Sequence, residues 1–164
     1  MSDPIWLGPR PPSRTEWREM QEAMGSSPDC YHLLEERVEG LVADIVKRPY
    51  AVSFGSTGDA IEAALDALGA DDGAEIVAPS LGPAVLGTAA ARSRARVRYA
   101  DVDAKTLTLR AEGASYQVTP VTRAIVGVSA HGQPAGLDEL AALASRNEIP
   151  LLEVVVRSEE HTSE

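Results

Sequence analysis

Short apolar runs alternate with amphipathic helical segments from residue 50 to residue 156, and this alternation constrains the fold more than any other feature. The apolar runs predict strands at 50–54, 75–78, 96–101, 124–129 and 150–156. Helical spacing predicts helices at 58–68, 81–91 and 137–146, with a hairpin-like piece near 107–109 and a short helical segment near 112–118. Strands separated by helices of this length are typical of βαβ crossovers. The sequence therefore predicts an α/β fold of three layers, α/β/α, with a mostly parallel sheet.

Residues 1–48 lack this alternation and form a separate part of the prediction. A proline-rich arm covers 5–14, and Ser13 or Thr15 can cap a helix that runs to about residue 24. Apolar residues at helical spacing predict a second helix at 31–47. We therefore divide the chain into an N-terminal arm with helices at 1–48 and an α/β domain at 49–156.

The acidic composition restricts the classes of partner. The formal net charge of −10 disfavours binding to nucleic acid or to an anionic membrane. No apolar run approaches the length of a membrane span, the N-terminus lacks the features of a signal peptide, and a single cysteine, Cys30, excludes an internal disulfide. We therefore expect a cytoplasmic protein. We interpret the basic cluster of Arg92, Arg94, Arg96 and Arg98 as a solvated face rather than an anion site.

A turn of small residues, Gly55-Ser56-Thr57-Gly58, separates the first predicted strand from a helix. The first N–H groups of a helix have no partner within the helix, and the helix dipole adds about half a positive charge there. An anion, most often phosphate, is the natural ligand of such a turn. The alternative is an ordinary helix cap, in which Ser56 or Thr57 accepts hydrogen bonds from the first turn. The turn by itself leaves both interpretations open.

Ligands of parallel sheets bind beyond the carboxyl ends of the strands, which places several polar segments on one rim. These segments are 53–58, 79–84, 101–103, 129–133 and the end of the last strand. Asp101, Asp103 and His131 would be candidates for a metal site, but an Asp-x-Asp turn usually caps backbone N–H groups, so we predict no metal. We interpret His131 as a surface residue, with a role on the rim as the alternative. The chain contains no GxGxxG motif, which disfavours a dinucleotide-binding domain.

The segment 157–164, RSEEHTSE, corresponds to the translation of the start of a widely used sequencing adapter. We interpret it as a non-native tail on a truncated reading frame, so His161 is not considered as a ligand or a base. A genuine charged tail is the alternative. Sequencing the locus from intact DNA distinguishes the two.

From residue 5 to residue 156 the chain resembles the DegT/DnrJ/StrS-type aminotransferases, which use pyridoxal phosphate and mostly act on nucleotide-linked keto-sugars. The resemblance rests on an ordered series of segments: LGPRPP at Leu7, LEERVEGLVADIVKRPYAV at Leu34, STGDAIEAALDALGADDGAEIVAPS at Ser56, YADVDAKTLTL at Tyr99, VTPVTRAIVGVSAHGQPAGLDELAALA at Val118 and IPLLE at Ile149. The series covers nearly the whole chain but only the N-terminal part of the family's length. It implies a fragment, with part of the large domain of a fold-type I enzyme.

The resemblance also implies roles for individual residues. The turn at Ser56, Thr57 and Gly58 would hold the cofactor phosphate, although the family commonly has Gly-Thr where this chain has Thr57-Gly58. Pro83 lies in the region from which an aromatic side chain usually stacks on the cofactor ring. Val154 stands where an aspartate usually pairs with the pyridinium nitrogen. These are the five cofactor-binding candidates, but neither the proline nor the valine supplies the usual interaction.

The resemblance assigns no catalytic residue to this chain. Transamination requires a Schiff-base lysine, and neither Lys47 nor Lys105 matches the family's. We therefore expect the chain to be inactive by itself. Its full-length parent would be a homodimer that transfers an amino group from an amino acid to a keto-sugar. The alternatives are a catalytically silent homologue that binds a ligand or a partner, and an unrelated α/β nucleotide-binding module.

Overall fold

The computed structural model describes residues 12–25, 31–130 and 133–156, and the chain divides into two units, Met1–Ser53 and Phe54–Glu164. Most of the predicted arm, Cys30, His131 and the predicted tail at 157–164 lie outside the described residues. The second unit contains the sheet and all five cofactor-binding candidates. None of the helices in the described ranges combines the length and apolar character that crossing a bilayer requires.

The first unit contains the two predicted N-terminal helices. α1 (Arg14–Met24) begins after Ser13, whose hydroxyl accepts a hydrogen bond from the Glu16 N–H at 3.3 Å. The Glu16 carboxylate accepts one from the Ser13 N–H in return, so the pair forms a capping box. α2 (Tyr31–Val46) confirms the second predicted helix.

Residues 50–54, predicted as a strand, form no strand in the structure. Tyr50 and Val52 are 85% and 69% exposed. A strand requires a neighbour that satisfies its backbone hydrogen bonds, and no strand of the described sheet pairs with this segment. Instead, the N–H and the hydroxyl of Ser53 donate to the Glu39 carboxylate of α2 at 2.7 and 2.9 Å, which lowers the pKa of Glu39. The apolar pattern of residues 50–54 was therefore not enough to form a strand, because the segment has no pairing partner in the described sheet.

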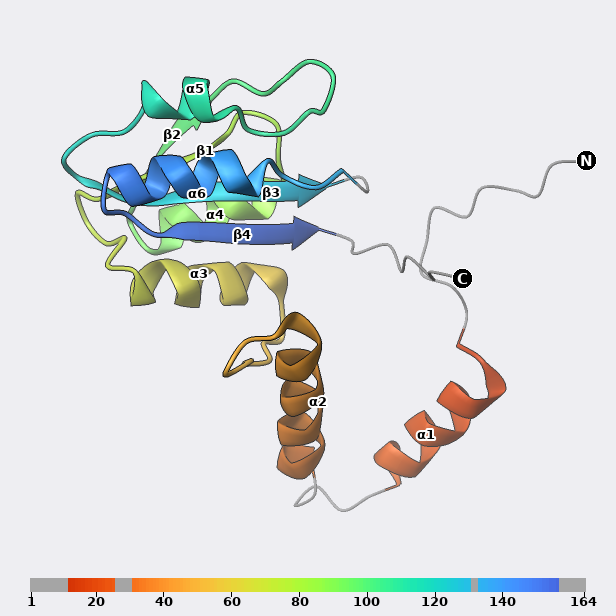
Figure 1. Cartoon of the computed structure of the whole chain (residues 1–164). Helices are drawn as coiled ribbons and strands as arrows, with labels where there is room; N and C mark the ends of the chain where they lie inside the picture. Colours follow the sequence, from red (N-terminus) through yellow and green to blue (C-terminus); the bar gives the residue numbers. More distant parts are fainter. Residues whose placement is uncertain (1–11, 26–30, 131–132, 157–164) are drawn as a thin grey trace, which may run out of the picture. The chain divides into compact units, whose positions relative to one another are not determined.

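The second unit is built on a four-stranded parallel sheet (Figure 1). Its strands are β1 (Glu75–Pro79), β2 (Arg96–Ala100), β3 (Thr122–Ala130) and β4 (Leu151–Val156), in the order β2-β1-β3-β4. Val77 of β1 lies opposite Arg98 and Ile125, and Val128 of β3 lies opposite Val154. The parallel pairings confirm the predicted fold class.

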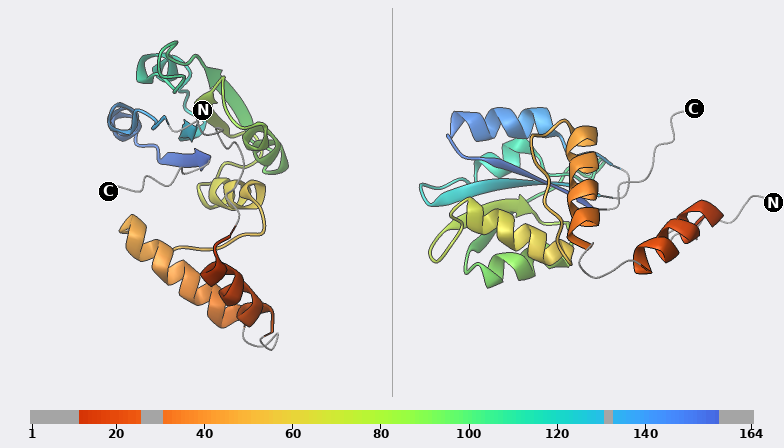
Figure 2. Two further views of the ribbon diagram at one scale, coloured as in Figure 1. Left: turned by 90° about the vertical axis from the view of Figure 1, so that its right-hand side faces the viewer. Right: turned by 90° about the horizontal axis from the view of Figure 1, so that it is seen from below.

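Helices cover both faces of this sheet (Figure 2). α3 (Thr57–Ala67) and α4 (Ala84–Arg92) pack on one face, whereas α5 (Ala111–Ser115) and α6 (Leu137–Arg146) pack on the other. Each face has its own buried cluster, with Leu65 and Leu86 on the α3–α4 side and Leu140 and Leu143 on the α5–α6 side. The three predicted layers are therefore confirmed.

Small residues let the helices approach the sheet closely. The buried cluster on the α3–α4 side includes the alanines Ala70, Ala78, Ala89, Ala90, Ala95 and Ala124. On the other side, a Cβ added to Gly127 of β3 would lie 3.3 Å from Leu140 Cδ1 and 3.4 Å from Leu137 Cδ2 of α6. Gly127 therefore sets the close contact between β3 and α6.

α4 begins at Ala84, later than the predicted start at residue 81. Pro83 is its N-cap and has extended backbone angles, φ −68° and ψ 130°. Helical backbone angles are disfavoured for the residue that precedes a proline. The helix therefore does not extend back through Gly82. This shift makes Pro83 part of the loop at the end of β1 rather than part of a helix.

Candidate functional site

The first turns of α3 and α4 lie at the edge of the sheet where the strands end (Figure 1). α4 follows β1 along the chain, and α3 runs antiparallel to the strands, so both helices begin beside the carboxyl ends of the strands. This is the edge at which parallel sheets bind ligands. Val154, near the end of β4, belongs to the buried cluster on the same face as α3 and α4. The turn at 56–58 and Pro83 therefore lie at this edge of the sheet, whereas Val154 is buried in the core beneath it.

α3 begins after Ser56, whose extended backbone, φ −151° and ψ 156°, makes it the N-cap. Its hydroxyl accepts a hydrogen bond from the Asp59 N–H at 3.2 Å and donates one to the Asp59 carboxylate at 2.7 Å. The ordinary helix cap is therefore present. Among the described residues, however, the N–H groups of Thr57 and Gly58 have no hydrogen-bond partner. The cap and an anion site are compatible in the same turn.

Gly58 is buried, and its lack of a side chain allows α3 to pack closely against α4. An added Cβ would lie 3.0 Å from Val85 Cγ2 and 3.8 Å from Arg92 Nη2. A side chain at this position would therefore require the Val85 side chain of α4 to shift by a few tenths of an ångström. The structure gives this glycine a packing role in addition to the role implied by the resemblance.

Arg92, in the last turn of α4, contacts the first two turns of α3. Its Nη2 lies 2.7 Å from Asp59 Oδ1 and 2.5 Å from Glu62 Oε2. The Ser56 hydroxyl and then the Arg92 guanidinium lower the pKa of Asp59. Hydrogen bonds to Asp59 and Glu62 raise the pKa of Arg92. Arg92 is therefore tied to the turn at 56–58 through Asp59.

Sequence reasoning missed this contact because 33 residues separate Arg92 from Asp59. The signal in the sequence was the acidic pair Asp59 and Glu62 on one side of α3, followed by the basic residue Arg92 at the end of α4. Arg98 pairs instead with Glu75, at 3.5 Å. Arg92, Arg94 and Arg96 are exposed and Arg98 is half-buried, so the cluster is largely solvated, and Arg92 and Arg98 form ion pairs in addition.

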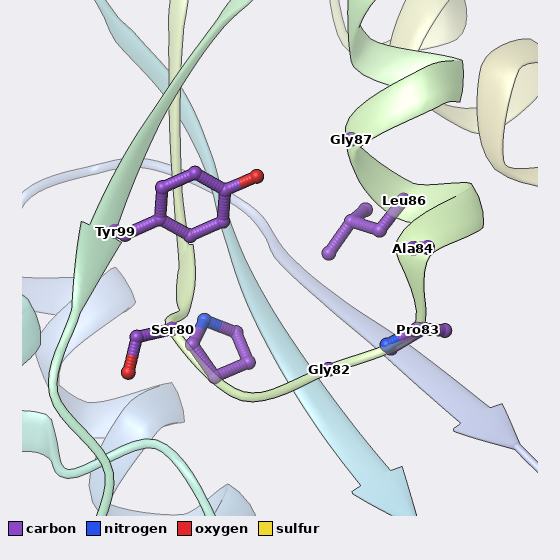
Figure 3. Close-up of a pocket in the computed structure, with 8 residues that line it drawn as sticks. Ser80, Gly82, Pro83, Ala84, Leu86, Gly87 and Tyr99 are labelled. Carbon is purple, nitrogen blue, oxygen red and sulfur yellow. The ribbon is translucent and has the colours of Figure 1, made fainter.

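Pro83 lines an open pocket of about 290 Å³ between α4 and the edge strand β2 (Figure 3). Tyr99 extends from β2 towards α4, and its hydroxyl lies 3.2 Å from the position of a Cβ on Gly87. The turn at 56–58 and Val154 do not line this pocket. The structure therefore brings an aromatic side chain near Pro83, but in a pocket apart from the other candidates.

Val154 is 6% exposed within the buried α3–α4 cluster. Side chains alternate along a strand, so its neighbour Glu153 lies on the other face of the sheet. The Glu153 carboxylate accepts a hydrogen bond from the Ser129 hydroxyl at 3.2 Å, and that hydroxyl accepts one from the Ala135 N–H at 3.0 Å. Glu153, rather than Val154, makes the polar contacts at this end of β4.

The turn predicted at Asp101–Asp103 lies slightly later, at residues 104–106, because Val102 forms an isolated antiparallel bridge with Leu109. Asp103 Oδ1 accepts hydrogen bonds from the N–H groups of Lys105 and Thr106 at 2.8 and 3.0 Å, and Asp101 Oδ1 accepts one from the Val102 N–H at 2.9 Å. Within the described ranges, no group of three or more His, Cys, Asp or Glu side chains is arranged to hold a metal ion. The carboxylates of this segment therefore cap backbone N–H groups.

Acidification is expected to loosen this turn. The N–H groups of Thr106 and Lys105 lower the pKa of Asp103 below 3.8, so the stabilisation is present above that value and is lost as the pH falls through the lowered pKa. Amide hydrogen exchange at Lys105 and Thr106 measures the effect. Asp103→Asn keeps an acceptor oxygen and should remove the pH dependence, whereas Asp103→Ala should speed exchange at every pH. Slow exchange in Asp103→Ala would contradict the capping role.

A family model, the DegT/DnrJ/EryC1/StrS aminotransferase family, matches residues 18–155. A curated relative from Pseudomonas aeruginosa, UDP-2-acetamido-2-deoxy-3-oxo-D-glucuronate aminotransferase, is 32% identical over 121 residues, which are 74% of this chain and 34% of the relative. The chain spans about a third of the length of such curated relatives.

Solved structures share the same fold. S. venezuelae DesV in complex with a ketimine intermediate has a TM-score of 0.74 at 27% identity, over 85% of this chain and 39% of that chain. E. coli GDP-4-keto-6-deoxy-D-mannose-3-dehydratase with bound hydrated PLP has a TM-score of 0.80 at 23% identity, over 95% of this chain and 42% of that chain. The parallel sheet agrees with the family match over residues 18–155. The chain therefore belongs to the DegT/DnrJ/EryC1/StrS aminotransferase family.

Proposed function

We propose that this chain carries the phosphate-binding part of a pyridoxal 5′-phosphate (PLP) aminotransferase that acts on a sugar. Membership of the aminotransferase family and the name of the P. aeruginosa relative support the reaction class. The structural observation that carries the proposal is the pair of N–H groups of Thr57 and Gly58. They lack partners among the described residues and lie on the rim of the sheet where ligands bind.

The donor set at the start of α3 fits a phosphate group. Two adjacent N–H groups have no partner in the part of the chain that the structure describes, the helix dipole adds about half a positive charge, and the exposed Thr57 side chain offers a hydroxyl. Hydrogen bonds to a phosphate are charge-assisted and therefore strong. The Ser56 hydroxyl already donates to Asp59. We therefore propose Thr57 and Gly58 as the direct phosphate ligands, and Ser56 as the residue that caps the helix beneath them.

The ring end of PLP fits this chain less well. A valine cannot pair with a protonated ring nitrogen, and Val154 is buried among apolar side chains. Pro83 offers only an aliphatic face. When bound, PLP supplies an electron sink that allows an amino group to move between an amino acid and a keto compound. We assign Val154 no part in that chemistry and propose that it supplies apolar packing beneath the rim.

For the longer protein that the relatives represent, we propose an amino acid as the donor and a nucleotide-linked keto-sugar as the acceptor. The name of the P. aeruginosa relative, which specifies a UDP-linked 3-oxo sugar, supports this acceptor class. We also propose assembly as a homodimer, which rests on the resemblance to the family alone.

Replacing Thr57 with proline is expected to weaken binding of pyridoxamine 5′-phosphate roughly tenfold or more, because one charge-assisted hydrogen bond contributes about 1.5–3 kcal/mol. Proline is favoured at the first position of a helix, and the extended Ser56 backbone suits the residue before a proline, so the fold should be retained. Isothermal titration calorimetry measures the affinity. Pyridoxamine 5′-phosphate has no aldehyde and therefore does not react with Lys47 or Lys105.

Thr57→Val is the matched control because it removes the hydroxyl and keeps the N–H. Its loss of affinity should be smaller than that of Thr57→Pro. Pyridoxamine, which lacks the phosphate, should bind weakly and equally to both variants. If the unmodified chain bound pyridoxamine and pyridoxamine 5′-phosphate equally, the proposed phosphate site would be wrong. Tight binding of UDP without binding of pyridoxamine 5′-phosphate would favour a nucleotide-binding module.

A further inference from the structure

Two carboxylates lie beside the turn that we assign to the phosphate. Asp59 is in the first turn of α3, and Glu62 lies about one turn further along. Their side chains are 52% and 30% exposed. A negative charge in the first turn stabilises a helix, but it also repels an anion bound at the same N-terminus. A compensating cation would therefore favour binding of a dianionic phosphate at Thr57 and Gly58.

Arg92 is placed to compensate both carboxylates. Its Nη2 lies 2.7 Å from Asp59 Oδ1 and 2.5 Å from Glu62 Oε2. Arg92 also lies beside Gly58, since an added Cβ at that residue would be in ordinary van der Waals contact with Arg92 Nη2, at 3.8 Å. The positive charge comes from the last turn of α4, where the dipole of that helix also favours it.

The contacts of Arg92 continue to the turn itself. Arg92 holds one oxygen of the Asp59 carboxylate, and the other oxygen accepts the hydrogen bond from the Ser56 hydroxyl at 2.7 Å. The same hydroxyl accepts a hydrogen bond from the Asp59 N–H. This arrangement fixes the N-cap without using the N–H groups of Thr57 and Gly58.

We propose that Arg92 is a positioning residue for the anion site at the start of α3. It neutralises Asp59, and through Asp59 it orients Ser56, so the turn is held in the conformation that accepts a phosphate. Arg92 itself is not assigned as a phosphate ligand. The inference rests on the proposed function in that the anion is taken to be the phosphate of PLP.

Replacing Arg92 with glutamine tests the inference in the 164-residue chain. Inorganic phosphate is titrated at low ionic strength, where charges are least screened, and the backbone amide signals of Thr57 and Gly58 are followed by NMR. The Kd for phosphate is expected to rise roughly three- to tenfold, because both carboxylates lose their counter-charge. The pKa of Asp59, followed by its carboxyl carbon shift, should also rise in this variant.

Arg94→Gln is the matched control. It removes the same charge two residues further along the chain, and Arg94 makes no ion pair within the described ranges. Its Kd for phosphate should stay within about twofold of the unmodified chain, as expected for an exposed charge. Adding Asp59→Asn to Arg92→Gln removes the uncompensated charge beside the turn but keeps an acceptor for Ser56. This double variant should recover most of the lost affinity.

The outcomes separate this inference from the proposed function. If Arg92→Gln and Arg94→Gln bind phosphate equally, Arg92 has no positioning role, whether or not the cofactor binds. If Arg92→Gln weakens phosphate binding but pyridoxamine 5′-phosphate binds no better than inorganic phosphate, the positioning role stands and the cofactor assignment fails. If phosphate shifts neither amide signal in the unmodified chain, both the anion site and the role of Arg92 are overturned.

Discussion

Replacing Val154 with aspartate is expected to lower the free energy of unfolding by about 3 kcal/mol at pH 7. Val154 is 6% exposed within an apolar cluster that includes Val128 and Leu86. An ionised carboxylate at this position would lose its hydration without gaining a hydrogen-bond donor from the cluster. Chemical denaturation of the whole chain, followed by circular dichroism, measures the loss.

The loss should depend on pH in one direction. Burial raises the pKa of the introduced carboxyl above its unfolded value. The loss of stability is therefore complete above the raised pKa, and it shrinks as the pH falls towards the pKa of the same carboxyl in the unfolded chain, about 4. Val155→Asp is the matched control, because Val155 is adjacent on β4 and 53% exposed. Equal stabilities of the two variants would contradict the burial of Val154.

The same substitution tests the position that the resemblance gives to residue 154. If the ring nitrogen of the cofactor faced this residue, an aspartate would strengthen binding of pyridoxamine 5′-phosphate. The ligand would then restore part of the lost stability, because it binds only the folded state. Unchanged binding would mean that residue 154 does not face the ring.

Replacing Gly127 with valine is expected to destabilise the protein by about 1–3 kcal/mol. A Cβ at this position would lie 3.3 Å from Leu140 Cδ1 and 3.4 Å from Leu137 Cδ2, and valine adds two further methyl groups. Valine has a higher strand propensity than glycine, so the substitution would stabilise β3 if there were room. A measured loss therefore reports crowding between β3 and α6.

A double-mutant cycle with Leu140→Ala provides the control for this crowding. Leu140 is fully buried, so Leu140→Ala by itself should cost about 2–5 kcal/mol. In the double variant the valine occupies part of the space that Leu140 leaves. The double variant should therefore lose less stability than the sum of the losses of the two single variants. Strict additivity in urea denaturation would mean that the two side chains do not compete for space.

The three layers could be predicted from the sequence because the patterns that indicate helices and strands lie within short segments. α6 has the predicted bounds, Leu137–Arg146, since apolar residues at helical spacing and short flanking loops define it. Alternation of helices with apolar runs led to the parallel sheet, because a strand returns to the same edge only through a crossover. These features depend on neighbouring residues rather than on distant contacts.

The segment 50–54 shows where local signals fail. Its apolar residues match a strand, yet strand formation depends on a partner that is distant in the sequence. The segment is instead held to α2 through Ser53 and Glu39. The start of α4 differed from the prediction for a local reason, since Pro83 restricts the residue that precedes it.

The site was predictable only in part for similar reasons. The turn at 56–58 was found because small residues between an apolar run and a helix are visible in the sequence. The link from Arg92 to Asp59 spans 33 residues and depends on how α3 packs against α4. The orientation of Val154 towards the α3–α4 cluster likewise follows from strand register, which pairs it with Val128. The sequence predicted the position of the turn but not the neighbours that support it.

The alanines between the sheet and the α3–α4 pair set the distance between the helices and the sheet. Each methyl group contributes little packing energy, but together they decide how far the two helices stand above β1 and β3. A larger residue at Ala89 or Ala124 would push the helix pair away from the sheet and move the first-turn N–H groups of α3 away from the strand ends. The geometry of the proposed anion site therefore depends partly on side chains that do not contact the anion.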